Sequence, residues 1–443
     1  MELCSYVGLH LARPVKSGSA KYCRDLYYDG KMLCIMAGTG AILLLFVMIA
    51  LAPPYAVYDE PFYIRYAQLI DRVGLSKEFL NLLPGTPGPL VAVVQYAAKP
   101  LTGIAPPGIR LLNAFLFLIC IGLCAMAVRA SGSNRWTTAA LSAIAIPVMW
   151  PGAGLGLSDA PAWVFVSLSV YCLVRWLRVS PDDRRNLYMW GSSAGLSLGI
   201  AALGRQNSLA IVAFPIIYAL AHRRYFSSAL VLLVTTTIVV APVFLVWKGI
   251  SPPSPLHVNI GLSLSNGILA FAYIGMFLLL LAPRFYWWRP YWIVGSIAAG
   301  IALNEITHVL SFAPMSGIAQ TFGSSMFAMY RAFVSGAILA LALYSITFFF
   351  IRLWENRASA MFALGVVGSF SIALSGMFVS GYSSRYTALG LPLFILISDR
   401  YSEATVWKAI RIVLGATLGA LSLWSYYQAV GWELSWDRVL NQN

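Results

Sequence analysis

The stretch Leu111–Val128 reads LLNAFLFLICIGLCAMAV and contains no charged residue. A helix rises 1.5 Å per residue, so about 20 apolar residues cross the roughly 30 Å hydrocarbon core of a bilayer. Comparable apolar runs occur at Ala41–Ala52, Ala229–Val246, Ile268–Ala282 and Ala332–Ile351. This pattern predicts an all-α integral membrane protein.

The composition of the whole chain agrees with this prediction. Of its 443 residues, 59% are hydrophobic and 10% are charged, whereas a soluble domain carries about 25% charged residues. The net charge of +14 would suggest a nucleic-acid partner for a soluble protein. In a membrane protein it reflects Lys and Arg in cytoplasmic loops, so we expect no nucleic acid.

The apolar runs predict a bundle of about thirteen transmembrane helices. Their expected ranges are 32–52, 108–128, 136–151, 159–177, 187–203, 207–221, 226–247, 262–282, 290–310, 326–351, 359–380, 386–398 and 408–430. About two-thirds of the 30 Lys and Arg residues then fall in alternate loops, which places the N-terminus in the cytoplasm by the positive-inside rule. We expect a cytoplasmic tail (1–31), a transmembrane module (32–430) and a C-terminal tail (431–443). The first apolar run lacks a small-residue cleavage site and is expected to be retained.

The first outer loop, residues 53–107, is the longest predicted loop. It contains an amphipathic helix over Pro61–Leu82, in which Phe62, Tyr66, Leu69 and Ile70 share one face. Such a helix is typical of segments that lie along a membrane surface. The Pro- and Gly-rich segment 84–89 that follows predicts a tight turn, and we expect the turn at 86–89 to form, with this helix, the roof of a site.

The polar residues that need an explanation lie at the outer ends of the predicted helices. They are Asp59, Glu60, Asp159, Arg205, Glu305, His308, Arg331, Arg385 and Tyr386. An ionisable group at membrane depth costs about 2.5–3.5 kcal/mol even on lenient insertion scales. Several such groups of mixed sign indicate a polar cavity that opens outward, although buried pairs that fix helix packing are the structural alternative.

These residue types suit the transfer of a group from a phosphate. Arginine binds phosphate through two parallel hydrogen bonds, and a carboxylate can take a proton from an attacking hydroxyl. The chain contains no Gly-rich nucleotide loop and no Asp-x-Asp metal motif, which disfavours a nucleotide-sugar donor. Cys120 and Cys124, one turn apart, are expected to pack rather than bind metal. No cofactor is predicted, and a divalent metal stays open as an alternative.

At these positions the sequence resembles the GT-C superfamily of polyprenyl-phosphate-sugar glycosyltransferases, which carry a catalytic acid in the first outer loop. The matching segments are Tyr58–Phe62 (YDEPF), Ser158–Pro161 (SDAP) and Ser384–Tyr386 (SRY), the last followed by Leu391–Pro392. A narrower resemblance, to the dolichyl-phosphate-glucose α-1,2-glucosyltransferases, rests on short islands. Those islands are Asp59–Tyr63, Ala67–Gln68, Thr86–Gly88, Arg110–Asn113, Gly204–Ser208, His257 and Arg385–Thr387. Tyr63 stands where that family has a histidine.

The resemblance implies a GT-C-type bundle that transfers a sugar from a polyprenyl-phosphate donor to a glycan, lipid or protein acceptor. We expect Asp59 to be the general base of an inverting transfer, with Glu60 as a second candidate. Arg205, Arg385 and Lys248 are expected to bind the donor phosphate. The expected substrate-binding residues are Asp159, Gln206, His257, Glu305, His308 and Tyr386. The site would face away from the cytoplasm, in a bacterial inner membrane or the endoplasmic reticulum.

Two other functions stay open at this point. A ligase or polymerase that moves a preassembled glycan from a lipid pyrophosphate would use similar chemistry. A transporter or flippase for a lipid-linked or anionic substrate would use the same outward cavity, but we find no paired halves of the kind that many transporters show.

Overall fold

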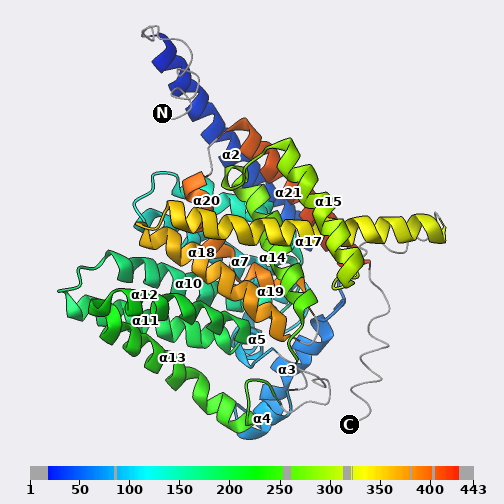
Figure 1. Cartoon of the computed structure of the whole chain (residues 1–443). Helices are drawn as coiled ribbons and strands as arrows, with labels where there is room; N and C mark the ends of the chain where they lie inside the picture. The colour runs from blue at the N-terminus through cyan, green and yellow to red at the C-terminus, as the bar shows by residue number, and fades with distance from the viewer. Residues whose placement is uncertain are drawn as a thin grey trace.

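The protein is described by a computed structural model (Figure 1). It describes residues 18–83, 87–252, 261–312, 321, 323–379, 382–401 and 405–428, with side chains from residue 30 onward. Within these ranges every element of regular secondary structure is a helix, and there is no β-strand. Helix α2 (Gly18–Ala50) enters at the top of Figure 1, and α3 (Glu60–Val73) and α4 (Lys77–Asn81) lie at the bottom.

Eight described helices are long and apolar enough to cross a membrane. They are Gly30–Ala50 of α2, α7 (Gly108–Ala130), α10 (Asp159–Arg178), Arg223–Trp247 around α13 (Phe226–Trp247), α14 (Leu264–Leu281), α17 (Ser324–Glu355), Ala360–Phe378 around α18 (Ala360–Ser375) and α21 (Val406–Tyr427). The protein is therefore a multi-pass α-helical membrane protein, as predicted. The number thirteen stays a prediction, because some predicted spans are short or broken.

The predicted span 136–151 is the clearest broken one. It consists of α8 (Trp136–Leu141), a 3-10 turn η2 (Ser142–Ala145) and α9 (Met149–Gly154). The break comes at Ile146, which is extended with φ −86° and ψ 108° because the following Pro147 disfavours the helical conformation there. Helix α21 crosses this break closely: a Cβ built at Gly415 would lie 2.0 Å from the Ala145 carbonyl oxygen.

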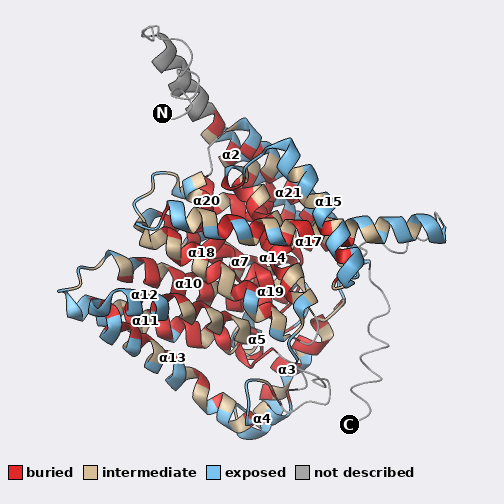
Figure 2. Ribbon diagram, viewed as in Figure 1, coloured by how far each residue is buried: buried red, intermediate tan, exposed pale blue. Residues whose placement is uncertain are grey.

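Two other predicted spans are also divided. Residues 207–221 form η3 (Gln206–Val212) and α12 (Ala213–Ala221), and 386–398 falls in α19 (Ser384–Ala388) and α20 (Leu391–Tyr401). The predicted spans 187–203 and 290–310 correspond to α11 (Arg184–Ala202) and α15 (Pro290–Thr307). Buried residues concentrate around α7, α10 and α14, whereas α17 extends beyond the bundle (Figure 2).

The predicted helix over Pro61–Leu82 is two helices, because Gly74 interrupts it with a φ of 63°. Its apolar face does not lie on a membrane surface. Phe62, Tyr66 and Ile70 are buried, and the Trp247 indole donates to the Leu80 carbonyl at 2.9 Å, which ties α4 to α13. The first loop therefore packs onto the bundle.

The segment after α4 docks on the turn that carries Arg205. The Leu90 amide, at the start of α5 (Leu90–Ala97), donates to the Leu203 carbonyl at 3.1 Å. Only glycine fits at residue 88, since a Cβ there would lie 2.1 Å from the same oxygen. Of the predicted turn at Thr86–Pro89, Thr86 lies outside the described residues.

The basic loops meet at one end of the bundle. Arg178, at the end of α10, donates to the Ser131 carbonyl, and Ser133 donates to Asp399 at 2.6 Å. Arg352 donates to the Phe285 carbonyl at 2.7 Å. Asp159, at the start of α10, lies at the opposite end of that helix from Arg178. Which end faces the cytoplasm stays a prediction.

Candidate active site

Asp59 and Glu60 are neighbours in the sequence, but their side chains have different surroundings. Asp59 is the N-cap position of α3 and makes no capping hydrogen bond, and Glu60 is the first residue of the helix. Consecutive helical side chains point about 100° apart, at 3.6 residues per turn. Glu60 is fully buried, whereas the Asp59 side chain keeps 16% of its surface exposed.

The Glu60 carboxylate is saturated with hydrogen bonds. One oxygen accepts from Arg110 Nε and the Gly156 amide, both at 2.8 Å, and the other from Arg110 Nη2 at 2.6 Å and the Val57 amide at 2.9 Å. Because its oxygens are occupied and buried, Glu60 is not placed to accept a proton from a substrate. The prediction of Glu60 as a second base therefore disagrees with the geometry.

Arg110 extends this pair into a clamp on the loop before α3. It donates to the Pro53 carbonyl at 2.6 Å and to the Tyr55 carbonyl at 2.8 Å. The side-chain amide of Asn113, one turn further along α7, donates to the Leu155 and Leu157 carbonyls at 2.7 and 2.8 Å. Together these bonds fix the loop that ends at Asp59 and the loop that ends at Asp159.

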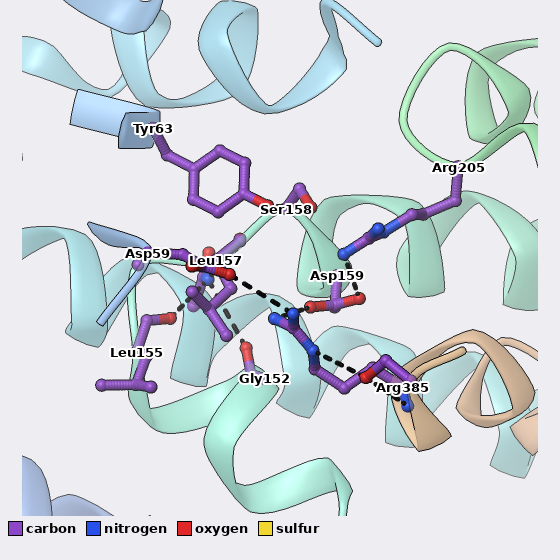
Figure 3. Close-up of polar contacts among 12 residues, drawn as sticks. Asp59, Tyr63, Gly152, Leu155, Leu157, Ser158, Asp159, Arg205 and Arg385 are labelled. Carbon is purple, nitrogen blue, oxygen red and sulfur yellow. Dashed lines mark hydrogen bonds and ion pairs between the residues drawn. The ribbon is translucent and has the colours of Figure 1, made fainter. Parts of the chain in front are cut away.

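Asp59, Asp159, Arg205 and Arg385 form a continuous chain of ion pairs (Figure 3). Arg205 Nη2 donates to Asp159 Oδ1 at 2.8 Å, and Arg385 Nη1 donates to Asp159 Oδ2 at 3.2 Å. Arg385 Nη2 reaches Asp59 Oδ2 at 3.4 Å, across 326 residues of sequence. The two arginines predicted to bind phosphate thus converge on one carboxylate.

Burial and aromatic rings shape the electrostatics of this chain of ion pairs. Desolvation by burial raises the pKa of Asp59 above its ordinary value, although the nearby Arg385 and Arg205 oppose that shift. Burial also opposes the charge on Arg385, but Asp159 and its other neighbours raise the pKa of Arg385, which stays protonated. The Arg205 guanidinium lies 5.2 Å from the Tyr386 ring, and the Arg385 guanidinium lies 5.6 Å from the Tyr58 ring.

Part of the hydrogen-bonding capacity of Arg205 is unused. Within the described residues, its buried Nε has no hydrogen-bond partner, and neither has the buried hydroxyl of Ser208 one turn away. A buried donor without a partner is costly, by about 1–3 kcal/mol. An anionic group that enters the site would satisfy the guanidinium.

The structure does not bring every predicted site residue to this chain of ion pairs. Gln206 follows Arg205 directly, and Tyr386 lies against it. Lys248 is exposed at the C-terminal end of α13, and Glu305 and His308 are exposed at the end of α15. His257 lies outside the described residues. The expected roles of these four residues stay predictions without geometric support.

Three contributors were not among the predicted site residues. In the sequence, Arg110 and Asn113 were noted only as part of a segment that resembles a known family, and Tyr63 only as a departure from that family's pattern. In the structure, the Ser158 hydroxyl donates to the Tyr63 hydroxyl at 3.2 Å, next to Asp159 in the sequence. Burial raises the pKa of Tyr63 to about 12. A charged residue at the start of an apolar helix was the sequence signal for Arg110. Among the described residues, no group of three His, Cys, Asp or Glu side chains could hold a metal ion.

Comparison with solved structures gives partial similarities at low identity. No protein-family model and no curated protein matches the chain. A crystal structure of ArnT from Cupriavidus metallidurans bound to undecaprenyl phosphate aligns with a TM-score of 0.43 and 17% identity, over 87% of this chain and 77% of that one. The Pmt1-Pmt2 protein O-mannosyltransferase complex of S. cerevisiae, bound to its sugar donor, aligns with a TM-score of 0.39 and 18% identity. The alignment covers 50% of this chain and 33% of that one.

The oligosaccharyltransferase of Archaeoglobus fulgidus, tethered to an acceptor peptide, aligns with a TM-score of 0.31 and 14% identity over 84% of this chain and 55% of that one. Similarities this low carry neither substrate nor mechanism to this chain. The narrower resemblance to dolichyl-phosphate-glucose glucosyltransferases gains no support and stays a prediction.

Proposed function

We propose that this protein is a membrane glycosyltransferase that moves a sugar from a polyprenyl-phosphate donor to an acceptor hydroxyl. The observation that carries the proposal is the chain of ion pairs from Arg205 through Asp159 and Arg385 to Asp59. It combines two guanidinium groups with a carboxylate at its more exposed end. Those are the groups that a phosphate leaving group and a hydroxyl nucleophile require.

Asp59 acts as the general base in this proposal. The acceptor oxygen attacks the anomeric carbon, its proton passes to Asp59, and the bond from that carbon to the phosphate oxygen breaks in the same step. The configuration at the anomeric carbon is therefore inverted. Among the acids of the site, Asp59 is the suitable base because its side chain keeps some exposed surface, whereas Glu60 and Asp159 are fully buried.

Arg205 and Arg385 stabilise the polyprenyl phosphate as it leaves. Donors already aimed at the place where charge develops lower a barrier without reorganising. Asp159 holds the two guanidinium groups beside one another, and the free Nε of Arg205 supplies a further donor. The lipid tail would lie in the bilayer beside the bundle, at the end opposite the basic loops.

The test uses purified protein with a panel of short-chain polyprenyl-phosphate sugars and measures released polyprenyl monophosphate. Asp59→Asn should lower the rate by about 10²–10⁴, the usual contribution of a general base. Asp71→Asn is the matched control, because Asp71 lies in the same helix α3 but is exposed and paired with Lys99 at 2.7 Å.

Three results would contradict the proposal. Near-parental transfer by Asp59→Asn would remove Asp59 as the base. Turnover of lipid pyrophosphate glycans in place of monophosphate sugars would indicate a ligase. Movement of an intact lipid-linked sugar between leaflets, with no phosphate released, would indicate a carrier.

A further inference from the structure

A groove on the surface of α7 lies away from the candidate active site. It encloses about 410 Å³ and is lined by α7 residues between Ile119 and Arg129 and by Trp136 at the start of α8. Gly122 keeps the groove open, since a Cβ built there would meet no atom within 4 Å. Ile119 and Met126 are about half exposed, and α7 is one of the membrane-spanning helices. The groove therefore faces the acyl chains of the bilayer.

A polar hollow is lined by residues that lie between Arg129 and Trp136 in the sequence. It encloses about 610 Å³ and is formed by residues 131–135 together with Asp399 and Arg400 at the end of α20. The segment 129–136 lines both spaces, because Arg129 and Trp136 border the groove and the residues between them border the hollow. The two spaces therefore adjoin the same loop, the groove with an apolar lining and the hollow with a polar one.

The loop that joins the two spaces is held in place. Arg178 donates to the Ser131 carbonyl, and Ser133 donates to Asp399 Oδ1 at 2.6 Å. Gly132 has a φ of 87°, in the left-handed region that favours glycine. The hollow is therefore formed by a turn with defined side-chain contacts.

The charges around the two spaces favour an anion with hydroxyl groups. In the described part of the chain, Arg129 and Arg400 have no carboxylate partner. The Arg129 guanidinium lies over the Trp136 ring at 5.8 Å, and tryptophan prefers the depth of lipid headgroups. Asp399, the acid in the lining of the hollow, can accept hydrogen bonds from hydroxyls.

We propose that the groove and the hollow bind one anionic phospholipid with a hydroxylated headgroup, from the leaflet at the basic-loop end. One acyl chain lies in the groove across Gly122. The phosphate binds Arg129 and Arg400, and the headgroup hydroxyls bind Asp399. The apolar groove selects a lipid over a free phosphate, and the net positive charge selects an anionic lipid over a zwitterionic one.

The test is native mass spectrometry of the purified full chain with phosphatidylglycerol and phosphatidylcholine of identical acyl chains. The wild type should bind phosphatidylglycerol more tightly. Arg129→Gln and Arg400→Gln should each weaken that binding about fivefold, since a basic residue near an anionic lipid contributes about that factor. Gly122→Phe should weaken the binding of both lipids, because its ring would occupy the open groove.

Arg357→Gln is the matched control. Arg357 is also an exposed arginine at the basic end, 5.0 Å from the Trp354 ring, but it lines neither the groove nor the hollow. It should bind phosphatidylglycerol like the wild type. The proposal would be overturned if the wild type bound the two lipids equally, or if both Arg129→Gln and Arg400→Gln left phosphatidylglycerol binding unchanged. It would also be overturned if Arg357→Gln lost as much phosphatidylglycerol binding as those two variants. Thermal unfolding checks that the variants are folded, which their exposed or open positions lead us to expect.

Discussion

Removal of Arg110 should destabilise the fold more than any change at an exposed charge. The Glu60 carboxylate accepts four hydrogen bonds, two from Arg110 and two from backbone amides. Arg110→Met would leave it fully buried with the two backbone amides alone. The Pro53 and Tyr55 carbonyls would also lose their donor. Breaking a buried pair in this way costs about 3–5 kcal/mol.

Glu60→Gln should also be destabilising, although glutamine has the same shape. Both oxygens of Glu60 face donors, so the glutamine NH₂ group would oppose two N–H donors in either orientation. In the Arg110→Met background this conflict is partly relieved and no unpaired charge remains. The double variant should therefore be about 2 kcal/mol more stable than the sum of the two single changes predicts.

The measurement is the free energy of unfolding in mixed detergent micelles by denaturant titration, for wild type, both single variants and the double variant. Glu78→Gln is the control, because Glu78 is exposed in α4 and should change stability by less than about 0.5 kcal/mol. Additivity of the single changes within about 0.5 kcal/mol would refute the coupling. If Arg110→Met lowered the free energy of unfolding by less than about 1 kcal/mol, the argument that the buried Glu60 carboxylate needs Arg110 as its partner would be refuted.

The remaining predictions concern the base and the first loop. Because burial raises the pKa of Asp59 and a base must be ionised, kcat/KM should fall as the pH drops through a value above the ordinary carboxylate pKa of about 4; an acid limb at or below 4 would contradict this. Arg385→Gln removes the charge that most lowers the pKa of Asp59, so it should move the acid limb to higher pH as well as slow the reaction. An acid limb that stays in place would show that Asp59 and Arg385 are not coupled. Gly88→Ala should lower the free energy of unfolding by about 1–3 kcal/mol, because its Cβ would lie 2.1 Å from the Leu203 carbonyl oxygen. Gly249→Ala, where nothing lies within 4 Å, should have little effect in the same denaturant titration.

Local patterns were sufficient for the membrane-spanning part of the fold. Long apolar runs predicted α7, α10, α13 and α14 with ends close to the observed ones, because the length of an apolar run is itself the physical requirement for crossing a bilayer. The same reasoning failed at 136–151, where the residue before Pro147 leaves the helix, and at Gly74, which divides the predicted amphipathic helix. That helix was also assigned to the wrong surroundings, since amphipathicity reveals an apolar face but not whether lipid or protein covers it.

Sequence alone was enough to predict that this protein spans a membrane many times, that basic residues fall in alternate predicted loops, and that unexplained charges gather at the helix ends away from those loops. Composition and spacing are local properties, and they were enough for these conclusions. Which of these charges lie together could be read only from the folded chain. It joined Asp59 to Arg385 across 326 residues, separated Asp59 from its neighbour Glu60, and left Glu305 and His308 exposed on α15. An ion pair depends on distances between side chains of different helices, which the packing of the whole bundle sets.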